Sequence, residues 1–163
     1  MPAGFAAGLF GIGGGLITVP ILFYIFSTTG IEPSYVMHLA VGTSFGIIIP
    51  TSTVSVLTHH QHKAVDFNIV RGFGFFVAIG VILGTIFAAS LKTKPLILFF
   101  TIVVYILAFY LLFLKEKETK IEIKIGLFSK AISGIISGFI SAPMGIGGAV
   151  MNVPILKFFG YPI

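Results

Sequence analysis

The sequence contains no cysteine, and only 9% of its 163 residues are charged. The absence of cysteine excludes disulfide bonds and thiolate metal sites. The scarcity of charge is more informative than the absence of cysteine, because a soluble domain carries about 25% charged residues and covers its surface with them. With 56% hydrophobic residues and a mean hydropathy of +1.11, this chain lacks the polar side chains that a soluble fold needs. The composition therefore predicts a protein whose solvent is lipid.

The few charges are spaced so that long uncharged runs lie between them. Each run reaches the roughly 20 residues that an α-helix needs to cross a bilayer. The runs are 1–31, 33–62, 72–91, 95–114 and 131–156. We therefore expect an all-α fold, a polytopic transmembrane helical bundle. The run 95–114 is entirely aliphatic and aromatic apart from a threonine and a proline, and we expect it to face lipid.

The net charge of +5 comes from basic residues that gather between these runs. Basic loops indicate membrane topology by the positive-inside rule, rather than a face for nucleic acid. If every run crosses once, the loops after the second and fourth runs together hold seven Lys and Arg, against two for the loops after the first and third. We therefore expect the loops 59–68 and 115–127 to be cytoplasmic.

A glycine motif occurs twice at an offset of 134 residues. The sequence Gly-Ile-Gly-Gly-Gly at 11–15 precedes Pro20, and Gly-Ile-Gly-Gly-Ala at 145–149 precedes Pro154. This register predicts an internal repeat. The expected organisation is a first transmembrane repeat of about four spans at 1–114, a polar cytoplasmic linker at 115–124 and the truncated start of a second repeat at 125–163. Parallel and inverted repeats both occur in transporters, and both stay open here.

Each motif predicts a glycine-broken helix. Glycine is poor in helix interiors, and proline removes a backbone donor. We expect a break near 13–15 and a second half-helix from about Leu16. Broken helices survive in a bilayer only where the backbone is buried in protein or lines an aqueous cavity. The alternative is a continuous helix whose glycines admit a close neighbour, the packing that we also predict for Gly80-x-x-x-Gly84.

The break favours a site for a small anion. The second half-helix would point N–H groups and its positive dipole end at the break, where glycine admits a ligand to the backbone. The spans lack the acidic residues that would bind a cation or relay protons. We predict substrate binding by Gly11, Gly13, Gly14, Gly15, Thr18, Thr43, Ser44, Gly145, Gly147, Gly148 and Asn152, with structural breaks at Pro20 and Pro154.

Three histidines, His59, His60 and His62, lie at the end of the second run, after a helix that we expect at about 36–58. A zinc site generally needs three or four ligands in a rigid frame, and neither cysteine nor a suitably spaced acid completes this set. We expect a solvated interfacial loop there, with no metal and no cofactor. The glycine run also fails as a nucleotide motif, because position 16 is leucine and no Lys-Ser or Lys-Thr follows. His38, near one end of its run, is expected at the membrane interface.

The ordered set of motifs resembles the sulfite exporter TauE/SafE family of membrane proteins. The matching residues are Ala7-Gly8, the motif at 11–15, Val19-Pro20, the Ala-Val-Gly-Thr-Ser sequence at 40–44, His59-His60, Val65-Asp66 and the recurrence at 145–154. The resemblance implies two related halves and the movement of sulfite, sulfonates and related organic or sulfur-containing anions across the inner membrane. The chain departs from the family in length, because the later spans of the second half are absent.

We therefore expect an integral membrane transporter of a small anion, and not an enzyme. Its expected partners are the anionic solute and the lipid bilayer, without nucleic acid, and a homo-oligomer is compatible with the sequence. Two alternatives stay open. One is a structural or assembly subunit that packs other membrane proteins through its Gly-x-x-x-Gly faces. The other is an intramembrane metal enzyme that uses the three histidines.

Overall fold

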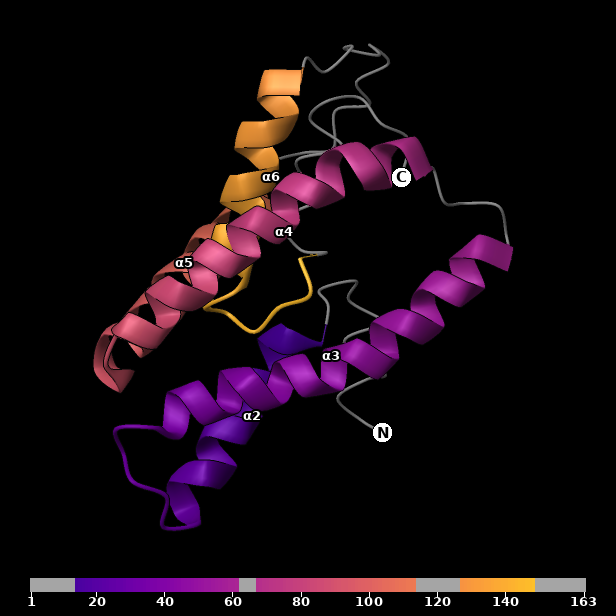
Figure 1. Ribbon diagram of the computed structural model, residues 1–163. Helices are drawn as coiled ribbons and strands as arrows, with labels where there is room; N and C mark the ends of the chain where they lie inside the picture. Colours follow the sequence, from indigo (N-terminus) through magenta and orange to yellow (C-terminus); the bar gives the residue numbers. More distant parts are fainter. Residues whose placement is uncertain (1–13, 62–66, 114–126, 149–163) are drawn as a thin grey trace.

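The computed structural model describes residues 14–61, 67–113 and 127–148. These residues form the helices α2 (Gly15–Thr28), α3 (Val36–Gln61), α4 (Phe67–Ser90), α5 (Thr93–Phe113) and α6 (Leu127–Ser141) (Figure 1). Helices α3, α4 and α5 are long and apolar enough to cross a membrane, whereas α2 and α6 are shorter. For this part of the chain, the prediction of an all-α transmembrane bundle is confirmed.

The second span is longer than predicted. Helix α3 continues to Gln61, so His59 and His60 belong to its last turn and not to a loop. The expected loop at 59–68 is correspondingly shorter, because α4 already begins at Phe67. Polar residues at the end of a spanning helix can extend it beyond the apolar stretch, since the helix satisfies its own backbone groups in water as well as in lipid.

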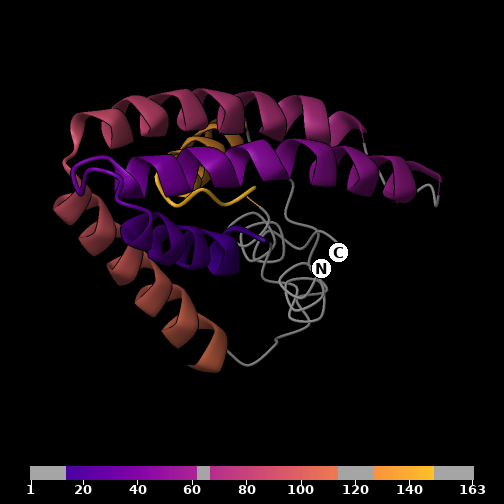
Figure 2. The ribbon, with the colours of Figure 1, turned by 90° about the horizontal axis from the view of Figure 1, so that it is seen from below.

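Helices α2 and α3 form a hairpin, whereas α4 and α5 are joined by a short turn and diverge from it. The two turns lie at the same end of the bundle, at the left of Figure 2. Residues 29–35 join α2 to α3 and include Gly30 with a φ of 77°. Leu91 and Lys92 join α4 to α5. The hydroxyl of Thr93 donates to the carbonyl oxygen of Ser34, which ties one turn to the other.

His38 strengthens this connection. Its Nε2 lies 3.2 Å from the carbonyl oxygen of Ala88 and 2.9 Å from that of Leu91. Both partners are acceptors, so Nε2 carries the hydrogen. The ring is half-buried, and within the described residues its Nδ1 is buried without a hydrogen-bond partner. His38 therefore links the start of α3 to the end of α4.

We expect His38→Ala to lower the free energy of unfolding by about 1–3 kcal/mol, because it removes the hydrogen bonds that join the start of α3 to the end of α4 and takes this donor from the Leu91 carbonyl. The melting temperature of the full-length protein in detergent would measure this loss. His59→Ala is the matched control, since His59 is exposed at the other end of α3. Similar losses in the two variants would contradict a linking role for His38.

Helices α4 and α6 pack backbone to backbone through glycine. A Cβ atom on Gly80 would lie 2.2 Å from the carbonyl oxygen of Ile135, and one on Gly138 would lie 2.2 Å from that of Val77. Real side chains do not approach this closely, so only glycine fits at these positions. Gly84 is obstructed in the same way by α6. The predicted close packing at Gly80-x-x-x-Gly84 is confirmed.

Three of the helices run in the same direction. Gly80 contacts Ile135, and Gly84 contacts Phe139. Because residue numbers increase in the same direction along α4 and α6, the two helices are parallel. Helices α2 and α4 both end at the turns tied by Thr93. Helices α2, α4 and α6 therefore all run toward that end, and α3 and α5 run away from it.

Helix α5 is not simply a lipid-facing helix. Leu96 is fully buried, and Phe100 and Leu107 are buried beside it, whereas Tyr105 and Phe109 are exposed. The expectation that this span faces lipid is therefore wrong for one of its sides. Its buried side belongs to a core that also includes residues of α2, α3 and the segment after α6.

Candidate functional site

A helix ends just before the second glycine motif. Helix α6 ends at Ser141, where the N–H of Gly145 donates to the carbonyl of Ala142 (3.1 Å) and the N–H of Ile146 to that of Ser141 (3.2 Å). With Gly145 at a φ of 61°, these two bonds form a Schellman cap, in which a left-handed residue ends the helix. The chain then continues out of the helix to Gly148, which also has a positive φ of 76°.

The first glycine motif begins a helix. Gly14 is the N-cap of α2 and makes no side-chain capping bond, while its carbonyl accepts the N–H groups of Ile17 (3.2 Å) and Thr18 (2.9 Å). The predicted start near Leu16 agrees to within one residue. Pro20 lies inside α2, so the helix continues through it and the discontinuity does not lie at the proline.

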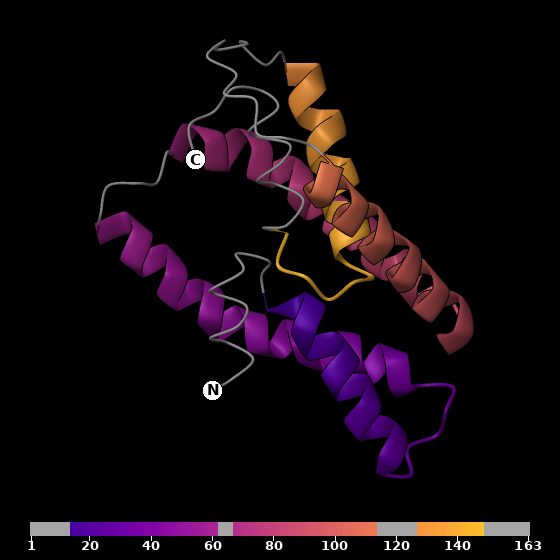
Figure 3. The ribbon, with the colours of Figure 1, turned by 180° about the vertical axis from the view of Figure 1, so that it is seen from behind.

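The two motifs meet in space. A Cβ atom on Gly15 would lie 2.2 Å from the carbonyl oxygen of Gly145 and 2.8 Å from the Cα of Ile146. A Cβ atom on Gly145 would lie 2.9 Å from the Cγ2 of Val19. The segment that follows α6 thus passes between the α4–α6 pair and the α2–α3 hairpin (Figure 3). We call this contact of Gly15 with Gly145 the glycine junction.

Ser44 of α3 completes the glycine junction. Its hydroxyl donates to the carbonyl oxygen of Gly145 at 2.8 Å, and the residue is only 1% exposed. The unwound segment frees carbonyl groups that must be paired in the absence of water. Ser44, predicted as a substrate residue, therefore pairs one of these carbonyls.

The other predicted residues are distributed around the junction. Thr18 is half-buried and donates its hydroxyl to the carbonyl of Gly14 at 2.7 Å. Thr43 is half-buried beside Ser44, Gly148 is buried, and Gly147 is exposed. A Cβ atom on Gly147 would lie 3.2 Å from the Cγ2 of Ile48. Outside the described residues lie Gly11, Gly13, Asn152 and Pro154.

One buried hydroxyl at the break was not predicted. Ser141 is the last residue of α6, is 2% exposed, and has no hydrogen-bond partner for its Oγ within the described residues. The signal for it is the spacing of serines at 129, 133, 137 and 141, which puts one hydroxyl on each successive turn of the helix.

The buried polar side chains of the described residues are all neutral. They are Ser44, Thr93, Ser137 and Ser141. The glycine junction therefore has backbone groups and hydroxyls available for a ligand, and within the described ranges it has no buried carboxylate to repel an anion. His59 and His60 are exposed in the last turn of α3, and the third histidine of that group, His62, lies outside these ranges.

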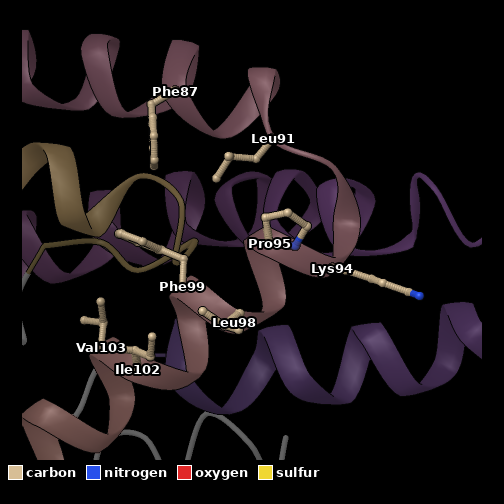
Figure 4. A pocket seen from close by; sticks show the side chains of 8 residues that line it. All are labelled: Phe87, Leu91, Lys94, Pro95, Leu98, Phe99, Ile102 and Val103. Carbon is tan, nitrogen blue, oxygen red and sulfur yellow. The ribbon is translucent and has the colours of Figure 1, made fainter.

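A separate groove of about 580 Å³ lies between α4 and α5. Its lining residues are Phe87, Leu91, Lys94, Pro95, Leu98, Phe99, Ile102 and Val103 (Figure 4). The ammonium group of Lys94 extends away from the other lining side chains. This groove is apolar and offers an anion no other side-chain donor, so the glycine junction is the better candidate site.

A comparison with known protein families gives a match over the whole chain. The family model described as sulfite exporter TauE/SafE matches residues 1–163. A probable membrane transporter protein of Haemophilus influenzae is 34% identical over 99% of this chain and 61% of its own length. One from Methanocaldococcus jannaschii is 31% identical over 98% of this chain and 60% of its own.

The chain spans only about 60% of the length of these two relatives. A probable membrane transporter protein of Bacillus subtilis is 26% identical over 98% of this chain and 66% of its own length. No solved structure matches this chain.

Proposed function

This chain belongs to the sulfite exporter TauE/SafE family, and from this premise we propose that the whole protein carries a small anion, such as sulfite or a sulfonate, across the inner membrane. The chain is part of a multi-pass membrane protein. The observation that carries the proposal is the glycine junction, where the segment that follows α6 meets the start of α2 within the bundle.

The chemistry of the junction suits an anion. Helix α2 begins there, and the N-terminus of a helix has a positive partial charge of about half a unit. The neighbouring α6 ends at Ser141, and Gly147 in the segment that follows is exposed, so a solute can approach the backbone there. Hydroxyls and N–H groups can donate hydrogen bonds to an anion, and the described residues include no buried carboxylate to balance the charge of a cation. We propose Gly14, Gly15, Thr18, Thr43, Gly147 and Gly148 as residues that line the substrate site, together with the predicted residues outside the described ranges.

The architecture offers a way to open and close this site. Helix α2 packs on α3, and α6 packs on α4, so each glycine motif is attached to a different helix pair. Movement of one pair relative to the other would separate Gly15 from Gly145 and expose the junction. The internal repeat predicted from the two motifs would give alternating access from the two sides of the membrane. The ends of α3 and α6 nearest the basic loops are placed in the cytoplasm in this proposal.

The test is the flux of radiolabelled sulfite into proteoliposomes that hold the full-length protein, with and without a pH gradient. We expect saturable flux in the wild type and loss of flux in Gly147→Leu, because the larger side chain would fill the junction beside Ile48. Insertion into the membrane should be unchanged. Gly46→Leu is the control, since Gly46 of α3 is exposed and a Cβ atom there meets nothing within 4 Å.

Absence of flux of both sulfite and methanesulfonate, with the protein folded, would overturn the proposed substrate class. A partner protein that co-purifies with such an inactive protein would favour a structural subunit instead.

A further inference from the structure

Most helical hydroxyls in this protein bond back to their own helix. The hydroxyl donates to the carbonyl oxygen four residues earlier in Thr18, Ser27, Thr51, Thr53, Thr58, Thr85, Thr101 and Ser133. This bond satisfies a hydroxyl in an apolar environment without any other partner. These eight hydroxyls therefore require no ligand.

Ser141 departs from this pattern. It is 2% exposed, and its Oγ neither donates to the carbonyl of Ser137 nor finds another partner in the described part of the chain. A buried polar group without a partner costs about 1–3 kcal/mol. Because such groups are rare in native proteins, each one requires an explanation. The unpaired hydroxyl is one that a bound ligand would satisfy.

The position of Ser141 connects it to the glycine junction. Ser141 is the last residue of α6, and its carbonyl accepts the N–H of Ile146 in the cap that ends the helix. The cap also contains Gly145, whose backbone touches Gly15. The hydroxyl of Ser141 therefore sits where the helix unwinds, one turn from the contact between the two glycine motifs.

A row of serines leads to this position along α6. Ser129 is exposed and Ser133 is half-buried, whereas Ser137 and Ser141 are almost fully buried. Residues four apart lie on the same side of a helix. Hydroxyls therefore follow α6 from its exposed start to its end, and apart from Lys130 the other residues of this helix are apolar.

We propose that Ser141 donates its hydroxyl hydrogen to an oxygen of the transported anion when the anion occupies the glycine junction. This inference rests on the proposed function and adds to it a specific donor. Oxyanions such as sulfite and sulfonates present oxygens that accept hydrogen bonds, and a bond from a hydroxyl to a charged oxygen is about twice as strong as one between neutral groups. A neutral donor also avoids the cost of keeping a charged side chain buried when no anion is bound.

The test compares Ser141→Ala with wild type in the full-length protein, by binding of radiolabelled sulfite in detergent with methanesulfonate as competitor. We expect the variant to bind sulfite about 10- to 100-fold more weakly, the loss of one hydrogen bond to a charged group. In the absence of anion, its melting temperature should equal or exceed that of wild type, because the substitution removes an unpaired buried hydroxyl. Ser133→Ala is the matched control and should bind sulfite as wild type does, since its hydroxyl is bonded within α6.

The outcomes separate this inference from the proposed function. Equal sulfite binding by wild type and Ser141→Ala would overturn the role of Ser141 and leave anion transport intact. A lower melting temperature of Ser141→Ala without anion would show that the hydroxyl has an internal partner, which also overturns the inference. If wild type neither binds nor transports sulfite or methanesulfonate, both the inference and the proposed function fail.

Discussion

Replacing Gly15 with alanine is expected to reduce anion flux to background and to destabilise the protein by more than about 3 kcal/mol, a large effect for one methyl group. The added Cβ would lie 2.2 Å from the carbonyl oxygen of Gly145 and 2.9 Å from its carbonyl carbon. These are backbone atoms and cannot rotate away as a side chain would. The segment after α6 would have to leave α2, and the bond from Ser44 to the Gly145 carbonyl would be strained or lost.

The measurement is the flux of radiolabelled sulfite together with the melting temperature of the full-length protein. Gly42→Ala is the control, because Gly42 lies on the neighbouring helix α3 and a Cβ there meets nothing within 4 Å. It should retain wild-type flux and stability. If Gly15→Ala also retains both, the close contact of the two motifs is not required for the working protein.

The second large effect is expected for Gly80→Ala in α4. Its Cβ would lie 2.2 Å from the carbonyl oxygen of Ile135, so α4 and α6 could no longer touch along their backbones. Helix–helix association in lipid depends on such close packing, because lipid tails are as apolar as the side chains and provide no hydrophobic driving force. We expect a loss of more than about 3 kcal/mol and a protein that aggregates or is degraded.

Gly72→Ala is the matched control for this prediction. It lies on the same helix, and a Cβ there meets nothing within 4 Å. Size-exclusion chromatography and melting temperature in detergent would compare the two variants. Equal behaviour of Gly72→Ala and Gly80→Ala would argue against backbone packing of α4 on α6.

Gly80→Ala should lower both stability and flux, whereas Gly147→Leu should lower flux alone. The two variants therefore distinguish the packing of helices from the access of the substrate.

The spans were predictable because their signal is local. An uncharged run long enough to cross a bilayer must form a helix there, since no other open structure satisfies its backbone. The end of α3 was placed too early because polar residues such as His59 and His60 mark the end of the apolar run, which is not the end of the helix. The buried side of α5 was missed because residues that face protein and residues that face lipid are equally apolar, so composition cannot distinguish them.

The candidate site was predicted in its parts but not in its assembly. The sequence indicated that Gly15, Ser44 and Gly145 are unusual, because glycine and hydroxyl side chains are conspicuous in an apolar span. Ser44 was expected to serve the solute, and the structure shows that its hydroxyl pairs the carbonyl of Gly145. Ser141 was overlooked because a serine in a membrane helix normally bonds to its own backbone, and only the three-dimensional structure shows that this one does not.

The sequence by itself determined that this protein spans a membrane and that its second glycine motif ends a helix. Both follow from properties of neighbouring residues, namely long runs without charge and a glycine that readily adopts the left-handed conformation of a helix cap. Only the tertiary structure decided that Gly145 lies against Gly15, since the contact joins residues 130 positions apart in the chain. That contact depends on how α6 packs on α4 and how α2 packs on α3. The spacing of Gly80 and Gly84 predicts that a helix packs closely on α4, but it does not say which helix that is.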